Sequence, residues 1–152
     1  MAVRTRLLLA FGLMGLTFAI SQTLMIRELL VEYVHEDWVG ELDFATLELQ
    51  NGSYVTDAYR GRHDDLIWRV RWGADWLYVY LLLEFQSEID RFMAVRMLTY
   101  VGLLYQDLIK QGKLATEGLL PPVLPMVLYN GQPRWSAATD IEQLIQRVPG
   151  GL

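Results

Sequence analysis

The chain contains no cysteine and only two histidines in 152 residues. Without cysteine it can form neither disulfides nor thiolate metal sites. The two histidines, His35 and His63, lie too far apart in the sequence for a familiar zinc-binding spacing. Neither histidine therefore needs a role as a metal ligand.

Positive charge is also scarce, since 13 lysines and arginines face 18 aspartates and glutamates, for a formal charge of -5. Proteins that coat DNA depend on clusters of basic residues, so this balance argues mildly against such a protein. A metal bound to acidic residues would offset part of the charge. Several arginines near the candidate site could form a phosphate track, or could equally be solvated side chains beside aromatic residues. These are Arg60, Arg62, Arg69, Arg71, Arg91 and Arg96.

Nothing in the middle of the chain indicates a linker or an internal repeat. With 53% hydrophobic residues, the chain is long enough to form one domain with a sizeable core.

The most informative feature is a predicted β-hairpin. Apolar runs around 65–70 and 78–83 flank the sequence Trp72-Gly73-Ala74-Asp75, which is typical of a turn. A two- or four-residue loop centred between Gly73 and Ala74 would place Asp65 opposite Leu82. A three- or five-residue loop would not.

The predicted register brings acidic residues together at the open end of this hairpin. Because side chains alternate along a strand, Glu84 and Gln86 share the face of Leu82, and Asp65 and Glu84 become diagonal neighbours. Two nearby carboxylates favour a hard divalent cation, and magnesium could support phosphodiester hydrolysis. The alternative is that Glu84 and Gln86 lie on a solvated face. The run 78–83 is apolar on both faces, however, which favours a strand covered on both sides.

Several segments carry a resemblance to a known family. Asp65 followed by Glu84-Phe85-Gln86 resembles the Asp...Glu-x-Gln variant of the PD-(D/E)XK nuclease core. The surrounding sequence, from about Met25 to Leu152, resembles the bacterial recombination-promoting nucleases, a family also labelled putative transposase (YhgA-like). It includes Asp64–Val70, Tyr78–Ser87, Met93–Tyr100 and Pro121–Gly131.

The resemblance implies a magnesium- or manganese-dependent DNA endonuclease that promotes recombination in the bacterial cytoplasm, and it leaves a homodimer open. It implies that Asp65 and Glu84 hold the metal and that the carbonyl of Phe85 adds a ligand. Gln86 would stand where the wider superfamily has lysine. Glutamine offers hydrogen bonds but no charge, so we expect slow turnover.

The two ends of the chain depart from the family pattern. Residues 1–24 form an atypical apolar segment, and Leu7 to Ile26 contains no charge, which imitates a membrane span or a secretory signal. Polar Ser21, Gln22 and Thr23 weaken both interpretations, so membrane association is the weaker expectation. We expect the nuclease-like domain to occupy residues 25–152 and to be shortened at its C-terminus.

The remaining elements complete an expected α/β, restriction-endonuclease-like core, with a mixed sheet made of the hairpin plus a crossover strand and flanked by helices. A helix is predicted from Met25, with Glu28 or Glu32 facing either the metal or solvent. Further predictions are a strand at 41–49, a helix at 89–111, a strand at 121–128 and a tight turn at 130–131. In the second helix, Arg96, Thr99, Gln106 and Lys110 should mark a narrow solvated stripe, with the rest in the core.

Fold analogy alone does not establish the chemistry. The rival hypothesis is a catalytically inactive, shortened remnant that serves as a DNA- or protein-interaction domain.

Overall fold

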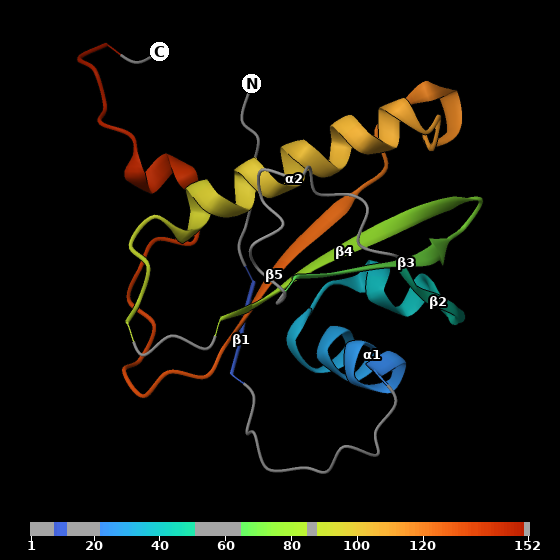
Figure 1. Cartoon of the computed structure of the whole chain (residues 1–152), viewed down its shortest axis with the longest axis horizontal. Coiled ribbons are helices and arrows are strands. Elements are labelled where there is room, and N and C mark those ends of the chain that lie inside the picture. Colours follow the sequence, from blue (N-terminus) through green and yellow to red (C-terminus); the bar gives the residue numbers. More distant parts are fainter. Residues whose placement is uncertain (1–7, 12–21, 51–64, 85–87, 151–152) are drawn as a thin grey trace.

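The computed structural model describes residues 8–11, 22–50, 65–84 and 88–150. They form a five-stranded mixed sheet between helices, as Figure 1 shows. The sheet order is β1 (Leu8–Phe11), β5 (Val123–Tyr129), β4 (Asp75–Glu84), β3 (Asp65–Trp72) and β2 (Leu42–Gln50). The helices are α1 (Gln22–Tyr33) and α2 (Met93–Lys110), with 3-10 turns at Asp37–Glu41, Thr116–Gly118 and Ile141–Leu144. The predicted α/β, restriction-endonuclease-like class is confirmed.

Strand β4 lies at the centre of the sheet and has a hydrophobic core on each face. Tyr78, Tyr80 and Leu82 pack with α2 residues such as Met97 and Leu104. The alternate residues Leu77, Val79 and Leu81 pack with α1 residues such as Ile26 and Leu30. The strand is therefore covered on both sides, as its unbroken apolar run predicted. Each fully buried large apolar side chain contributes about 1.5–3 kcal/mol to folding.

The β3–β4 hairpin has the predicted register. Trp72 pairs with Asp75 and Asp65 pairs with Leu82, so a two-residue loop of Gly73 and Ala74 joins the strands. Gly73 has φ +60, a left-handed value that glycine adopts without strain. Glycine in the first position of a two-residue loop is typical of a type II′ turn, whose twist matches that of the strands.

A helical crossover joins β4 to the parallel strand β5. Their register runs from Tyr78 opposite Val123 to Glu84 opposite Tyr129. Helix α2 begins at Met93, later than the predicted residue 89, because Asp90 Oδ1 accepts a hydrogen bond from the Phe92 amide at 2.8 Å and forms a turn there.

The predicted solvated stripe of α2 is too narrow. Thr99, Gln106 and Lys110 are exposed as expected, and Arg96 is half-buried. Val95 and Ile109 are also 40% and 54% exposed, so the expectation that the rest of the helix is core was wrong. The helix packs on the sheet along one side, and two apolar residues fall outside that contact.

The predicted tight turn after β5 is also corrected. Residues 130–131 do not form a turn, and the chain bends instead at 132–133. Gly131 lies so close to the Tyr129 ring that a Cβ there would clash with it. The glycine is thus required for a close approach of side chain to backbone.

The predicted first helix and first strand are present. Ile26, Leu29 and Leu30 of α1 are buried at the predicted helical spacing. Strand β2 falls within one residue of its prediction and contains a register shift between Asp43 and Glu48.

Strand β1 was not predicted, since its sequence suggested a membrane span or a signal. It pairs in parallel with β5, from Leu8 opposite Met126 to Phe11 opposite Tyr129. A short apolar run without alternation does not distinguish a buried strand from these alternatives. Among the described residues, no helix has the length and apolar character needed to cross a membrane.

Candidate active site

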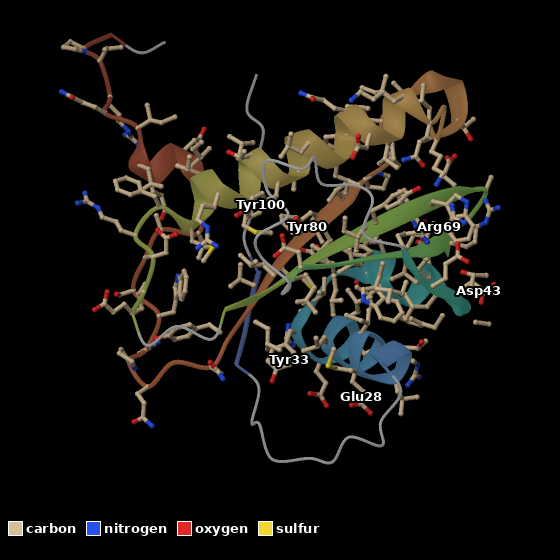
Figure 2. The ribbon with its side chains drawn as sticks, in the orientation of Figure 1. Glu28, Tyr33, Asp43, Arg69, Tyr80 and Tyr100 are labelled. Carbon is tan, nitrogen blue, oxygen red and sulfur yellow. The ribbon has the colours of Figure 1, made fainter. Side chains whose placement is uncertain are left out.

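Asp65 opens strand β3 and is half-buried on the face of the sheet that α2 covers. Its Oδ2 accepts a hydrogen bond of 2.8 Å from the hydroxyl of Tyr80 in β4. The ring of Tyr80 is fully buried and stacks on Tyr100 of α2, with ring centroids 5.9 Å apart and planes inclined by 14°. Figure 2 shows both tyrosines between the sheet and α2. The core thus holds a hydrogen-bond donor against the Asp65 carboxylate.

The environment of Tyr80 keeps its hydroxyl protonated. Burial raises the pKa of Tyr80 well above its ordinary value of 10.0, and the charge of Asp65 and the hydrogen bond to it raise the pKa further. Tyr80 therefore remains a neutral donor throughout the physiological pH range. Such a donor orients a carboxylate without cancelling its negative charge.

Tyr80 was missed in the sequence analysis, although the hairpin register contained the signal. Ile67 pairs with Tyr80, so Tyr80 and Asp65 are diagonal neighbours on one face. Diagonal cross-strand positions lie within reach of long aromatic side chains. Only the strand pairing was needed to identify this contact.

Glu84 is the last residue of β4, where its backbone pairs with Tyr129. It lies two residues beyond Leu82, the partner of Asp65, as the predicted diagonal arrangement requires. The structure does not describe the Glu84 side chain, and Phe85 and Gln86 lie outside the described residues. The backbone placement agrees with the hypothesis, whereas the convergence of the two carboxylates remains a prediction.

The donor chemistry fits a hard divalent cation. The Asp65 carboxylate offers oxygen, the ligand atom that magnesium and manganese prefer, and Tyr80 restricts its orientation. Within the side chains that the structure describes, no group of three histidines, aspartates or glutamates is placed to hold a metal ion.

The structure describes four of the six arginines suggested as a phosphate track, namely Arg69, Arg71, Arg91 and Arg96. Arg71 follows Asp65 by six residues in the same strand, or about 20 Å at strand spacing. Arg91 lies over the Phe92 ring at 5.4 Å, and Arg96 pairs with Asp90 at 2.9 Å. Arg60, Arg62 and His63 lie outside the described residues.

The suggestion that Glu28 or Glu32 faces the metal is wrong. Both are exposed on α1, which packs against the face of the sheet opposite to α2. Figure 2 places Glu28 on α1, across the sheet from Tyr80 and Tyr100.

The sequence has recognisable relatives. The family described as "Putative transposase, YhgA-like" matches residues 17–149. Recombination-promoting nuclease RpnD of Escherichia coli O157:H7 is 30% identical over 105 residues, covering 69% of this chain and 39% of RpnD. Recombination-promoting nuclease RpnA of Escherichia coli strain K12 is 32% identical over 89 residues, covering 59% of this chain and 29% of RpnA.

Some relatives are named as inactive proteins. "Putative inactive recombination-promoting nuclease-like protein YjiP" of Escherichia coli strain K12 is 30% identical over 74 residues, covering 49% of this chain and 72% of YjiP. No solved structure matches the chain. The chain spans well under half of the length of RpnD and RpnA. The family match over most of its residues nevertheless shows that the chain belongs to the YhgA-like putative transposase family, whose named relatives here are recombination-promoting nucleases and inactive nuclease-like proteins.

Proposed function

We propose that this chain is a magnesium- or manganese-dependent DNA endonuclease domain that hydrolyses phosphodiester bonds at the open end of the β3–β4 hairpin. The observation that carries the proposal is the hairpin register, which places Asp65 opposite Leu82 and one diagonal step from the Glu84 backbone. Membership of a family with relatives named as nucleases supports the same chemistry.

Asp65 and Glu84 are the proposed metal ligands, and the carbonyl of Phe85 adds a third oxygen. A bound divalent cation would lower the pKa of a water molecule and neutralise charge on the phosphoryl oxygens. Tyr80 acts as a positioning residue, since it donates its hydrogen bond to Asp65 Oδ2. Gln86 would orient water or phosphate by hydrogen bonds alone.

The test is nicking and linearisation of supercoiled plasmid by the purified chain in magnesium, manganese or EDTA. Asp65→Asn and Glu84→Gln remove one charge each and keep the shape of the side chain, and Glu88→Gln makes the same change at an exposed position. We expect metal-dependent cutting that both site variants lose and the Glu88 variant keeps. Circular dichroism should show that all the variants fold.

The second candidate is a catalytically inactive domain that binds DNA or protein. It is favoured by the names of YjiP and of the "Inactive recombination-promoting nuclease-like protein RpnE" of Escherichia coli strain K12, which is 28% identical over 87 residues. A folded wild-type chain that cuts no DNA in either metal would support this candidate. Such a result would contradict the nuclease proposal.

A further inference from the structure

A pocket of about 310 Å³ lies at the turn end of the β3–β4 hairpin, on the same face of the sheet as Asp65. Residues of β3 and β4 form its floor, and the segment that follows α2 closes one side. The polar and aromatic residues that line it are Arg69, Arg71, Asp75, Trp76, Tyr78 and Lys113. Figure 2 places Arg69 near this end of the hairpin.

The two arginines of the pocket are held by an aromatic ring. The guanidinium carbons of Arg69 and Arg71 lie 4.2 Å and 4.1 Å from the centroid of the Trp76 ring. Strand pairing explains the arrangement, because Arg71 lies opposite Trp76 and Arg69 is its diagonal neighbour. A guanidinium restrained by stacking loses less freedom when it binds a ligand.

Positive charge predominates in the pocket lining. Three cations, Arg69, Arg71 and Lys113, face one carboxylate, that of Asp75. Asp75 Oδ1 already accepts hydrogen bonds from the amide and the hydroxyl of Thr116, at 2.7 Å and 2.8 Å. Glu48 of β2 forms an ion pair with Nε of Arg69. Counting Glu48 as well, the cluster keeps an excess of one positive charge.

Arg71 has hydrogen-bond capacity left for a ligand. Its Nη1 donates to the carbonyl of Ala74 at 2.8 Å. A guanidinium carries five N–H donors in a planar fork. Within the described part of the chain, this is the only hydrogen bond that the Arg71 side chain makes, so the other edge of the fork can engage an oxyanion.

We propose that this pocket binds a phosphate group through Arg71, Arg69 and Lys113. The oxygens of a phosphate match the fork of a guanidinium and the point charge of a lysine ammonium. The phosphate belongs either to the backbone of DNA or to a free nucleotide. The DNA source rests on the proposed nuclease function, because the pocket would then anchor the duplex about 20 Å along the hairpin from Asp65.

The first experiment measures duplex binding without cleavage. Fluorescence anisotropy of a labelled 20-base-pair duplex in EDTA compares wild type with Arg71→Gln and Lys113→Gln. Arg147→Gln is the matched control, because it removes one positive charge at an exposed position outside the pocket. We expect the dissociation constant to rise about 5- to 10-fold in each pocket variant and less than about 2-fold in the control. The slope of log affinity against log salt concentration should become shallower by about 0.9 for each phosphate that the variant no longer neutralises.

The second arm identifies the source of the phosphate. Isothermal titration calorimetry with adenosine monophosphate and with inorganic phosphate uses the same four proteins. Weaker duplex binding by both pocket variants supports a DNA phosphate. If the pocket variants weaken only the binding of the small phosphates, the source is a free nucleotide. The proposal would be overturned if wild type bound none of the probes, or if both pocket variants bound every probe as wild type does.

Two controls separate folding and catalysis from binding. Arg71→Gln removes a stack on Trp76, so its thermal unfolding is measured; Lys113→Gln tests the pocket while both arginine–tryptophan contacts remain. Glu88→Gln, which changes an exposed carboxylate outside the pocket, should bind duplex in EDTA as wild type does. If the protein cut no DNA but bound it more weakly in the pocket variants, the result would support the phosphate site and contradict the nuclease proposal.

Discussion

The two ends of the β3–β4 hairpin differ in charge although they share one sheet face. At the open end, the Asp65 carboxylate accepts a hydrogen bond from a buried tyrosine. At the turn end, Arg69 and Arg71 stack on Trp76 beside a pocket. Between them, Ile67 and Tyr80 belong to the core under α2. A single rigid element can thus hold an acidic site and a basic site at a fixed separation, which suits the recognition of a polyanion that is cut at one point.

The largest expected effect distinguishes the two ends directly. Asp65→Asn should lower metal-dependent cutting by at least about 100-fold, because loss of a ligand should exceed the 10- to 100-fold effect of losing its supporting partner. Its DNA affinity in EDTA should not fall, because the substitution removes a negative charge beside the proposed position of the phosphate. Arg71→Gln should weaken DNA affinity and keep cutting at saturating DNA. Initial rates and anisotropy on the same preparations measure both effects. Parallel losses in both assays for both variants would mean that the ends are not functionally separate.

The next effect sharpens the description of the acidic end. Tyr80→Phe removes the hydroxyl that donates to Asp65 and keeps the ring that stacks on Tyr100. We expect the magnesium concentration for half-maximal cutting to rise about 10- to 100-fold. Tyr105→Phe is the control, since the Tyr105 hydroxyl is hydrogen-bonded to the backbone of Val123 and not to Asp65. A fall in maximal rate with no change in metal dependence would reduce Tyr80 to a purely structural role.

A smaller effect concerns the turn that fixes the register of both ends. Gly73→Ala has space for the added methyl group but imposes a left-handed φ on alanine, so we expect a loss of about 1 kcal/mol in the free energy of unfolding. Gly102→Ala, in the exposed middle of α2, should instead stabilise the chain by about 0.5–1 kcal/mol. Urea denaturation measures both. If both substitutions changed the free energy of unfolding in the same direction, the result would argue against the described turn.

The smallest effect is alkaline destabilisation through Tyr80. Its pKa in the folded state lies above the ordinary value of 10.0, so its contribution to stability is complete below pH 10 and declines as the pH rises further. At pH 10 the loss relative to pH 8 is about 0.4 kcal/mol for this group. Wild type should show this loss in excess of Tyr80→Phe in paired urea titrations. An identical pH dependence in the two proteins would contradict the shifted pKa.

Much of the acidic end could be predicted from the sequence. The turn predicted around Gly73 and Ala74 gives the register of Asp65 opposite Leu82 if the loop has two or four residues, and the structure has the two-residue loop. The crossover helix and the strand after it followed from periodicity and breakers, with boundaries wrong by a few residues. These features depend on local geometry, because strand alternation and turn type are set within a few residues of chain.

The basic end required the folded chain. Arg69 and Arg71 were two of six candidate phosphate-binding arginines in the sequence analysis. No local sequence feature distinguished these two from Arg91 or Arg96. Lys113 and Thr116 reach the hairpin only because the α2 crossover returns the chain above its turn. Such contacts join residues about forty positions apart, so their formation depends on packing of the whole core.

The sequence by itself determined the hairpin, its two-sided burial and a short set of possible registers, one of which places Asp65 beside the end of β4. Turn chemistry and side-chain alternation are sufficient for these features, because they act between near neighbours. Only the tertiary structure decided that β1 joins the sheet, that Tyr100 supports Tyr80 beneath Asp65, and that the arginines and Lys113 share a pocket. These outcomes depend on which surfaces the long-range packing of α2 and β5 brings into contact.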